Sequence, residues 1–290
     1  MKIVIKIGGT LLEDPAERLR IVERVAHQFR DGHQILLVHG GGKQLTRYLE
    51  RAGVTSEFIN GLRVTTADAI DGVVKVFAGT VNHQLLASFH RAGVPAVGIS
   101  GIDAGCLVAE KLTGQNGEDW GFVGKITRAN PRVWEVLLAG GFLPVMACLA
   151  VGDDGQIYNI NADQAAVDCA AAMRADALIF LTDVDGVRDA DGRILHRFDA
   201  GEIPHLIQSG AVTGGMLAKL NSIAEALAQG IPQVHIANGH IDESLENGIL
   251  VCAGGEEAQD KLSRTTARGT TVFASPALAA SRSRQHAEKN

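Results

Sequence analysis

Short runs of branched apolar residues recur along the chain and alternate with segments of helical periodicity. The runs are continuous, without alternating polar residues, which is the pattern of strands buried on both faces. The strand candidates are KIVIKI (2–7), QILLVH (34–39), AVGI (96–99), LPVMACLAV (143–151), ALIFLT (177–182) and QVHIA (233–237). The helix candidates span 15–29, 66–91, 132–139, 162–173 and 215–229. Because strand–helix–strand crossovers are right-handed, this order predicts an α/β fold, a three-layer αβα sandwich with a largely parallel central sheet.

Three stretches interrupt this alternation and are predicted to form hairpins, namely 105–127, 153–160 and 182–195. In the second of them, Asp154 and Gly155 supply the turn. The residues from 276 to 290 are small, polar and charged, and we expect them to form a disordered tail.

Composition limits the class of function. The chain has 290 residues, 46% apolar and 21% charged, which is typical of a globular protein and enough for two lobes. The net charge of -6 predicts no nucleic-acid partner, which would require a basic stripe. No apolar run approaches the roughly 20 residues of a membrane span, so no membrane association is expected. The four cysteines form no CxxC pair, so we expect no metal site and a reduced, cytoplasmic setting.

Two groups of glycines follow the first two strand candidates. Gly8 and Gly9 come after the first strand, and 40–42 is a run of three glycines after the second. In open α/β sheets, ligands bind at the carboxyl ends of strands, where backbone N–H groups and a helix N-terminus form an anion cradle. The alternative is that the glycines only tighten two turns. Two such loops on neighbouring strands favour phosphate contact, although neither matches a Walker A loop or GxGxxG.

Two charged residues break the apolar or helical pattern around them. Lys6 interrupts the first strand two residues before Gly8, and a lysine there must be paired or bound to an anion. Lys219 lies one turn into the helix that begins with GGMLAK, where its charge opposes the helix macrodipole. The alternative for each is a solvated surface lysine.

Polar residues also gather at two further points. In NINADQAA, Asn159 and Asn161 alternate on a strand, and Asp163 lies in the first turn of the next helix. This is more polar than a helix cap requires, although capping alone is the simpler alternative. In NGLRVT, Arg63 lies among turn residues and offers a planar fork for a carboxylate.

In this order, the motifs KIGGT, VHGGGK, NGLRVT, NINADQAA, LTDVDGV and GGMLAK resemble those of the amino acid kinase family. The resemblance covers about residues 2–273. Within the family, NGLRVT together with NINAD is similar to the branch that acts on N-acetyl-L-glutamate, rather than on aspartate, carbamate or uridylate. The resemblance implies ATP-dependent phosphorylation of the side-chain carboxylate to N-acetyl-L-glutamyl 5-phosphate, in arginine biosynthesis. ATP would bring Mg²⁺ bound through its phosphates.

The resemblance also implies roles for particular residues. Lys6 and Lys219 would hold the transferring phosphoryl group from opposite lobes, and Asp163 would hold the two lysines in place. The implied substrate-binding residues are Gly41, Gly42, Arg63 and Asn159, and the implied phosphate- or nucleotide-binding residues are Gly8, Gly9, Thr182 and Asp183.

Two lobes follow from the same resemblance. Residues 1–174 would bind acetylglutamate and dimerise, 175–275 would bind ATP, and 276–290 would be the tail. We expect a homodimer. Arginine-inhibited members carry an additional N-terminal helix that links dimers into hexamers, so the few residues before the first strand give the expectation of a dimer without arginine feedback. Residues 252–271 are longer than the family's usual last loop.

Other functions remain open at this stage. The same fold could phosphorylate glutamate itself, N-succinylglutamate or a carrier-linked aminoadipate, because the sequence does not fix the size of the acyl group. A non-catalytic amino-acid sensor would have the same fold but is disfavoured by the presence of Lys6, Asp163 and Lys219 together. A dinucleotide-dependent oxidoreductase is disfavoured because GxGxxG is absent.

Overall fold

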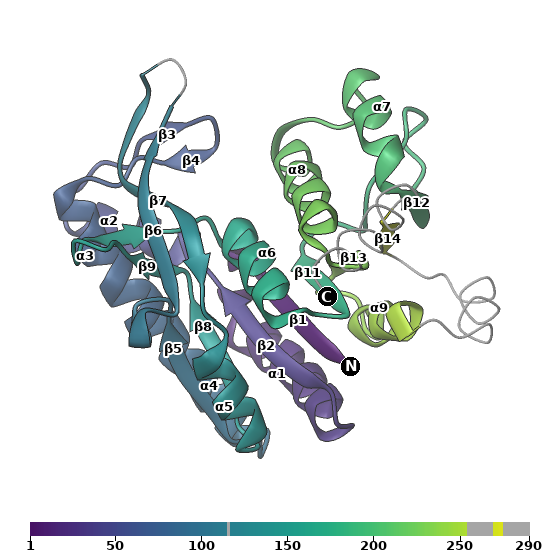
Figure 1. Cartoon of the computed structure of the whole chain (residues 1–290), viewed down its shortest axis with the longest axis horizontal. Coiled ribbons are helices and arrows are strands. Elements are labelled where there is room, and N and C mark those ends of the chain that lie inside the picture. The colour runs from purple at the N-terminus through teal and green to yellow at the C-terminus, as the bar shows by residue number, and fades with distance from the viewer. Residues whose placement is uncertain (115–116, 254–268, 275–290) are drawn as a thin grey trace, which may run out of the picture.

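A computed structural model describes residues 1–114, 117–253 and 269–274. Its largest feature is an eight-stranded sheet in the order β12-β14-β13-β11-β1-β2-β8-β5 (Figure 1). In chain order, the bounds of these strands are Lys2–Ile7 (β1), Gln34–His39 (β2), Ala96–Ser100 (β5), Leu143–Ala147 (β8), Ala177–Thr182 (β11), Arg197–Asp199 (β12), Gln233–Asn238 (β13) and Thr270–Phe273 (β14).

The sheet is parallel from β5 to β13, and β14 pairs antiparallel with β13. This confirms the prediction of a largely parallel sheet. Every predicted strand is present, but the run 143–151 divides at Cys148. Its second part, β9 (Leu149–Val151), leaves the sheet and joins a small closed barrel.

Helices cover both faces of the sheet, which confirms the three-layer αβα sandwich (Figure 1). Apolar residues from α1, α2, α3, α4 and α9 form one core with one face of the sheet, and those from α5, α6, α7 and α8 form a second core with the other. The bounds are Pro15–Arg30 (α1), Gly42–Arg51 (α2), Ala67–Val74 (α3), Asn82–Arg91 (α4), Arg132–Ala139 (α5), Ala162–Met173 (α6), Ile203–Gln208 (α7), Gly214–Gln229 (α8) and Ser244–Ala253 (α9).

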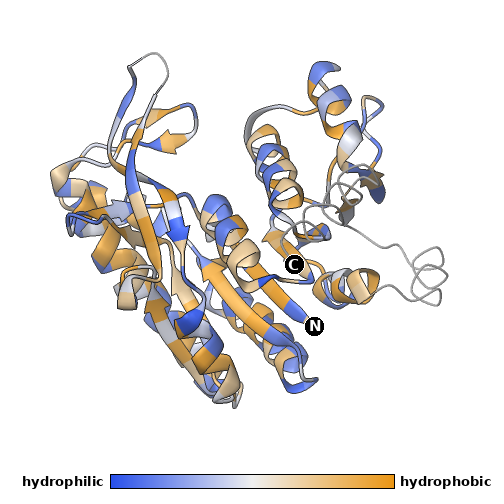
Figure 2. Ribbon diagram, in the orientation of Figure 1, coloured by the Kyte–Doolittle hydropathy of each residue, from blue (hydrophilic) through white to orange (hydrophobic). Residues whose placement is uncertain are grey.

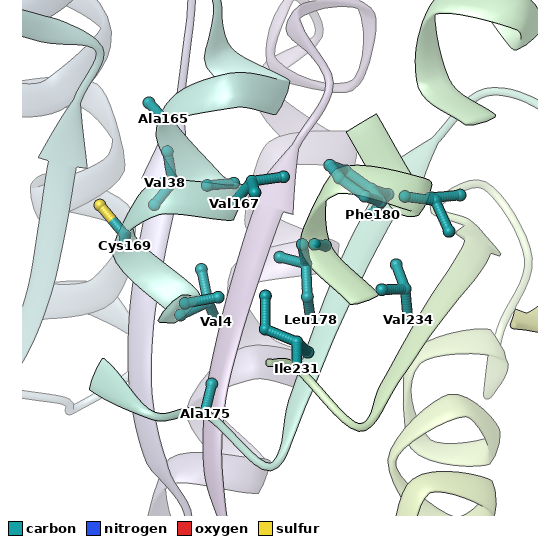
Figure 3. Close-up of a cluster of buried hydrophobic side chains, with 14 of the residues drawn as sticks. Val4, Val38, Ala165, Val167, Cys169, Ala175, Leu178, Phe180, Ile231 and Val234 are labelled. Carbon is teal, nitrogen blue, oxygen red and sulfur yellow. The ribbon is translucent and has the colours of Figure 1, made fainter. Parts of the chain in front are cut away.

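The second core explains why the strand runs are continuous and apolar. In Figure 3, Val4, Val38, Leu178 and Phe180 from the sheet lie beneath helices α6 and α8. Their neighbours along each strand point to the opposite core, because side chains alternate across a strand. Both faces are therefore buried, and the apolar colour of Figure 2 runs along the central strands.

The predicted helix 66–91 is not a single α-helix. It consists of α3, a π-helical segment η2 (Lys75–Val81) and α4, which follow one another without a break. A π-helical turn is rare and often occurs at functional sites. Helical periodicity could not reveal it, because a π turn shifts the pattern by only one residue.

The remaining strands lie outside the main sheet. β6 (Leu107–Thr113) and β7 (Asp119–Ala129) form the first predicted hairpin. β9 and β10 (Ile157–Asn159) form the second, but its first strand lies before the predicted range 153–160, which holds only the turn and β10. These four strands make the closed barrel. The third predicted hairpin is reduced to one bridge between Arg188 and Ile194. A short hairpin of β3 (Phe58–Ile59) and β4 (Leu62–Arg63) completes the set, with short 3₁₀ turns at Gly9–Leu12 (η1), Asp103–Gly105 (η3) and Ala200–Glu202 (η4).

Each half of the sheet is formed by one continuous part of the chain. Strands β5, β8, β2 and β1 come from residues before 174, and β11, β13, β14 and β12 come from residues after it. The two halves meet where β1 pairs with β11. The assignment of one half to the acid and the other to ATP stays a prediction. The predicted tail, and most of the segment 252–271, lie outside the described residues.

Candidate functional site

Lys6 lies on a buried strand, and its side chain faces the helices that cover this side of the sheet. On β1, Val4 belongs to the core beneath α6 and α8, while Ile5 and Ile7 belong to the opposite core. Since side chains alternate, Lys6 shares the face of Val4 and points toward those two helices. Its side chain is 12% exposed. Lys6 is therefore an inward-facing lysine at the carboxyl end of a central strand, and the surface alternative is excluded.

The carboxylate of Asp163 joins the two predicted lysines. Lys6 Nζ lies 2.6 Å from Oδ1 of Asp163, and Lys219 Nζ lies 3.1 Å from Oδ2. Burial alone would raise the pKa of Asp163, but the two ammonium groups outweigh burial and hold that pKa well below its ordinary value. The carboxylate is therefore ionised at neutral pH, and the three groups together carry one net positive charge.

Lys219 reaches this carboxylate from the first turns of α8. The residue is 8% exposed, and its Nζ lies 5.0 Å from the centroid of the Phe180 ring on β11. Burial lowers the pKa of Lys219; Asp163 raises it, and the charge of Lys6 lowers it again. Asp163 is thus the group that keeps a buried lysine charged beside a second lysine.

The two glycine loops lie against each other at the ends of β1 and β2. A Cβ on Gly9 would lie 3.4 Å from the backbone nitrogen of Gly42. The N–H of Gly8 donates to the carbonyl of Leu181 at 2.8 Å, so it continues the β1–β11 ladder. It is therefore occupied, and this loop can offer only N–H groups from Gly9 onward to an anion.

Gly41 and Gly42 of the second loop differ in what surrounds them. A Cβ on Gly41 would lie 3.0 Å from the Phe77 ring and 3.1 Å from Val81, both on η2, whereas a Cβ on Gly42 would meet nothing within 4 Å. Gly41 is therefore required by the protein's own packing. Gly42 begins α2 and faces open space, so only at Gly42 does the structure leave room for a bound group.

Arg63 is placed by a two-residue hairpin turn. Asn60 and Gly61 connect β3 to β4 with φ of 52° and 79°, as a type I′ turn requires. The guanidinium of Arg63 lies 4.6 Å from the Phe58 ring centroid and is 9% exposed as a residue. It donates to the Gly42 carbonyl at 3.1 Å, to Thr46 Oγ1 at 2.6 Å and to Ser56 Oγ. The arginine therefore contacts the open glycine directly.

Asn159 lies at the end of β10, on the opposite wall. Its Nδ2 donates to Thr65 Oγ1 at 3.0 Å, and Thr65 is fully buried because its backbone pairs with Trp120 and Phe122 of β7. Two residues later, Asn161 caps α6 by accepting from the N–H groups of Asp163 and Gln164. Asn161 is thus the capping residue, and Asn159 takes no part in the cap.

These residues enclose one pocket of about 180 Å³. Arg63 is its only charged lining residue, Asn159 and Asn161 supply amides, and the remaining lining is glycine or apolar. The lining residues are Gly40, Gly41, Gly42, Leu45, Phe58, Gly61, Leu62, Arg63, Phe77, Val123, Asn159, Ile160, Asn161 and Ala162. Because Ala162 precedes Asp163 directly, the pocket lies beside the two lysines.

Of the predicted phosphate- or nucleotide-binding residues, Gly8 and Gly9 lie beside the second glycine loop, whereas Thr182 and Asp183 lie at the end of β11, in the other half of the sheet. Thr182 ends β11, is 8% exposed, and its Oγ1 donates to Asp183 Oδ1 at 3.3 Å. The Thr182 carbonyl accepts from the N–H of Gly239, which follows β13. Asn238 Nδ2 donates to Asp185 Oδ1 at 2.8 Å and so ties the two loops together. These polar groups all lie at the carboxyl ends of β11 and β13.

Sequence reasoning missed several residues that shape the site. Thr46 and Ser56 hold Arg63, Thr65 holds Asn159, and Phe77 of η2 packs on Gly41. Only the turn that places Arg63 could have been recognised from the sequence, since Asn-Gly between apolar pairs is typical of a two-residue hairpin. The others are ordinary residues whose partners are distant in sequence.

Within the described part of the chain, no three histidine, cysteine, aspartate or glutamate side chains gather to hold a metal ion. Within that same part, no helix is both long and apolar enough to span a membrane.

Comparison with known proteins gives consistent results. Residues 1–238 match the model of the amino acid kinase family. The chain is 49% identical over 262 residues to an acetylglutamate kinase of Solibacter usitatus, covering 90% of this chain and 99% of that protein. It is 47% identical over 236 residues to an acetylglutamate kinase of Acidobacterium capsulatum, covering 81% and 90% respectively.

Among solved structures, an N-acetylglutamate synthase of Neisseria gonorrhoeae, complexed with coenzyme A and N-acetyl-glutamate, is similar with a TM-score of 0.76 and 27% identity. The match covers 85% of this chain but 56% of the synthase. A match over most of the chain to the family model, two close relatives and the lysine–aspartate–lysine arrangement beside a glycine-rich pocket lead to the same conclusion: the chain belongs to the amino acid kinase family.

Proposed function

We propose that this protein transfers the terminal phosphoryl group of ATP to the side-chain carboxylate of N-acetyl-L-glutamate, giving N-acetyl-L-glutamyl 5-phosphate in arginine biosynthesis. The observation that carries the proposal is the sharing of Asp163 by two buried lysines beside a pocket with one cation. The names of the relatives at 49% and 47% identity support the choice of acid.

The chemistry requires positive charge more than it requires a base. The attacking carboxylate has a pKa near 4.3 in solution, so it is already ionised at neutral pH. The obstacle is its approach to a polyphosphate of the same sign. Lys6 and Lys219 would hold the phosphoryl oxygens, where charge spreads during transfer, and this type of contact is worth most in a site without water.

Asp163 is then a positioning group and not a general base. Its pKa is held low by the two lysines, and both of its oxygens are engaged by them. A carboxylate whose pKa is held low and whose two oxygens each face an ammonium group accepts no proton from a substrate. Its contribution is to hold the two ammonium groups next to each other against their mutual repulsion.

The charge pattern of the pocket supports an acylated amino acid. Arg63 is suited to one non-reacting carboxylate, and Asn159 supplies an amide beside it. The ammonium group of free glutamate would find no carboxylate in the lining, and the extra carboxylate of N-succinylglutamate would find no second cation. An acetyl group is neutral and small, and the apolar lining suits it.

ATP would bind on the side of Thr182 and Asp183, with its phosphates directed toward Gly9 and the two lysines. Because the described residues gather no metal-binding group, Mg²⁺ fits best when bound through the phosphates. There it would neutralise phosphate charge. The described half from 1 to 174 would then hold the acid, and the half from 175 to 274 would hold ATP.

We also propose a cytoplasmic homodimer. All four cysteines are buried and unpaired, which fits a reducing compartment. The helical stretch from α3 through α4 is long enough, at 1.5 Å per residue, for a broad interface. Light scattering tests the dimer: a monomer or a hexamer would contradict it.

The decisive experiment traps the acyl phosphate with hydroxylamine while ADP release is followed. Hydroxamate should form only with ATP, Mg²⁺ and N-acetyl-L-glutamate together. Better turnover with glutamate, N-succinylglutamate or a carrier-linked aminoadipate would reject the choice of acid. Binding of acetylglutamate without ADP release would reject catalysis and favour an amino-acid sensor.

A further inference from the structure

A buried chain of hydrogen bonds runs beneath the Gly40–Gly42 loop. Asn82, the first residue of α4, directs Nδ2 both to the Val145 carbonyl at 3.0 Å and to Nε2 of His39 at 3.0 Å. The other ring nitrogen of His39, Nδ1, lies 2.8 Å from the Gly40 carbonyl. His39 is 0% exposed and Asn82 is 2% exposed, so no solvent shares these bonds.

The chemistry of the two ends fixes the direction of every bond. A carbonyl can only accept, so the atom of Asn82 that faces Val145 must be the amide nitrogen. That nitrogen carries no acceptor, so Nε2 of His39 must accept from it. Nδ1 of His39 must then carry the proton and donate to the Gly40 carbonyl. The geometry therefore selects one neutral imidazole tautomer.

The neighbouring residues leave space for the side chains of His39 and Asn82 but not for additional atoms. A Cβ on Gly98 of β5 would lie 2.0 Å from Oδ1 of Asn82. Directly before Asn82, η2 supplies Phe77 and Val81, the two side chains that pack on Gly41. One helical segment thus contacts the glycine loop twice, through apolar side chains at Gly41 and through the Asn82–His39 pair at Gly40.

A fixed Gly40 carbonyl determines what the next peptide group presents. The peptide bond is planar and trans, so the Gly40 carbonyl and the Gly41 N–H point in opposite directions. Tying the carbonyl to His39 therefore directs the Gly41 N–H away from His39. A loop of three glycines has little else to prevent this peptide from rotating, since glycine has no side chain to restrict it.

We propose that His39 and Asn82 are positioning residues of the kinase reaction, which hold the Gly40 peptide in the orientation that the acid and the phosphoryl group require. This role rests on the proposed function. Neither residue lines the pocket, whereas Gly40 does. They act through the backbone, and so they are not catalytic residues.

The tautomer is stable over the physiological range. Burial lowers the pKa of His39 to about 4, against a smaller opposing effect of the Gly40 bond. The charged or titratable neighbours do not reach the ring. Cys148 donates its thiol to the His39 carbonyl, and burial raises its pKa to about 12. Lys6 lies on the opposite face of the sheet, while Lys75 and His83, near Asn82, are exposed and bonded to Asp71 and Gly79.

The first test needs no variant. In protein labelled with ¹⁵N at histidine, His39 should show a protonated Nδ1 and an unprotonated Nε2 across neutral pH. This measurement does not depend on any activity, so it separates the present proposal from the assignment of the substrate. A protonated Nε2 in the wild-type protein would overturn the proposal.

The second test is kinetic. Asn82→Leu keeps the volume but removes the donor, and should lower kcat/KM for acetylglutamate roughly ten- to a hundredfold through misplacement of the loop. KM for the acid should rise while KM for ATP stays within about twofold. A merely destabilised protein would lose active molecules and leave both KM values unchanged, which would overturn the proposal. Ser88→Ala, which alters another buried polar residue of α4, is the matched control.

The third test creates a pH dependence. With Asn82→Asp, the introduced carboxylate and His39 together need a proton to keep Nδ1–H on the Gly40 carbonyl. Once that proton is lost at higher pH, the carboxylate draws the remaining ring proton to Nε2. The variant should therefore lose kcat/KM with rising pH along a limb that wild type and Ser88→Ala lack. Identical pH profiles for all three proteins would overturn the proposal.

Discussion

Lys6 and Lys219 lie on the two oxygens of one carboxylate, although one belongs to β1 and the other to α8. Two buried ammonium groups repel each other, and the charge of Asp163 between them offsets that repulsion, with a smaller contribution from Asp183 at Lys219. Burying two ammonium groups side by side therefore destabilises the fold, and so the arrangement indicates a function. It concentrates positive charge at the point where the pocket meets the carboxyl ends of the central strands.

Replacing either lysine should affect the transition state more than substrate binding. Lys6→Ala and Lys219→Ala should each lower kcat and kcat/KM together, by roughly 10²- to 10³-fold, as expected for loss of a donor to developing charge. Steady-state kinetics with each substrate varied is the measurement. Lys111→Ala, at an exposed lysine paired with Asp119, should change nothing. A variant of Lys6 that raised only KM for the acid would reverse the assigned role.

Arg63 should act on binding of the acid. Arg63→Ala should chiefly raise KM for acetylglutamate and leave KM for ATP nearly unchanged, because its contact is similar in ground and transition states. The Gly42 bond adds a smaller loss of kcat. Thr46→Val removes one support of Arg63 and keeps the guanidinium, so it should show a weaker form of the same effect. Loss of kcat alone in Arg63→Ala would contradict this prediction.

Removing the carboxylate of Asp163 should alter the pH profile of the enzyme. Burial and Lys6 lower the pKa of Lys219, and Asp163 raises it more than Asp183 does. Asp163→Ala should therefore let a lysine lose its proton at lower pH, and the alkaline limb of kcat should move toward neutral pH. Asp163→Asn, which still accepts one hydrogen bond, should lower kcat less than Asp163→Ala. An unmoved alkaline limb would show that neither lysine needs Asp163 to stay charged.

Asp168 should make stability depend on pH in the opposite sense to an ordinary ion pair. Burial between α6 and α8 raises its pKa to about 6, although Gln229 and Gln164 donate to it and oppose the rise. A carboxyl whose folded pKa is raised stabilises the fold below its unfolded pKa, and that contribution is lost as pH rises through about 6.

Wild-type protein should therefore lose stability relative to Asp168→Asn between about pH 4 and pH 6, the range set by the unfolded and folded pKa values. Urea denaturation at a series of pH values measures the difference. Glu23→Gln, at an exposed carboxyl on α1, is the control and should give no such trend. A constant difference between wild type and Asp168→Asn would contradict the raised pKa.

The neighbouring glycines should separate stability from activity. Gly41→Ala places a methyl group against Phe77 and should destabilise the fold by about 1–3 kcal/mol. The second change Phe77→Leu should recover part of that loss. Gly42→Ala has free space at the start of α2 and should leave stability unchanged or improve it. It should nevertheless reduce activity, because the added methyl occupies the open position beside Arg63. Equal activity in Gly42→Ala and wild type would exclude close approach there.

The fold was predictable because burial on both faces leaves a strong signal. Strands such as β1 and β11 read as continuous apolar runs, and their alternation with helices determines a parallel sheet. Helix α2 escaped prediction because glycines begin it, and β12 and β14 because each is short. The π-helical segment η2 was predicted only as part of an ordinary helix, because a single π turn leaves the helical pattern nearly unchanged.

The site was predictable where a residue conflicts with its local pattern. Lys6 in an apolar strand and Asp163 after two asparagines both stand out from their surroundings. The reason for Gly41 could not be read from the sequence, because the side chains that exclude a Cβ come from η2. For the same reason, the bond between His39 and Asn82 joins two ordinary residues, and only the fold brings them together.

The ladder between β1 and β11 continues to the edge of the site through the bond from Gly8 to Leu181. Lys6 and Asp163 both precede this seam in the chain, and Lys219 follows it. A hinge rotation of one half about this ladder would therefore change the distance from Lys219 to Asp163 and leave the distance from Lys6 to Asp163 unchanged. The Lys6–Asp163 ion pair lies within one half of the sheet, whereas the Lys219–Asp163 distance depends on the angle between the two halves.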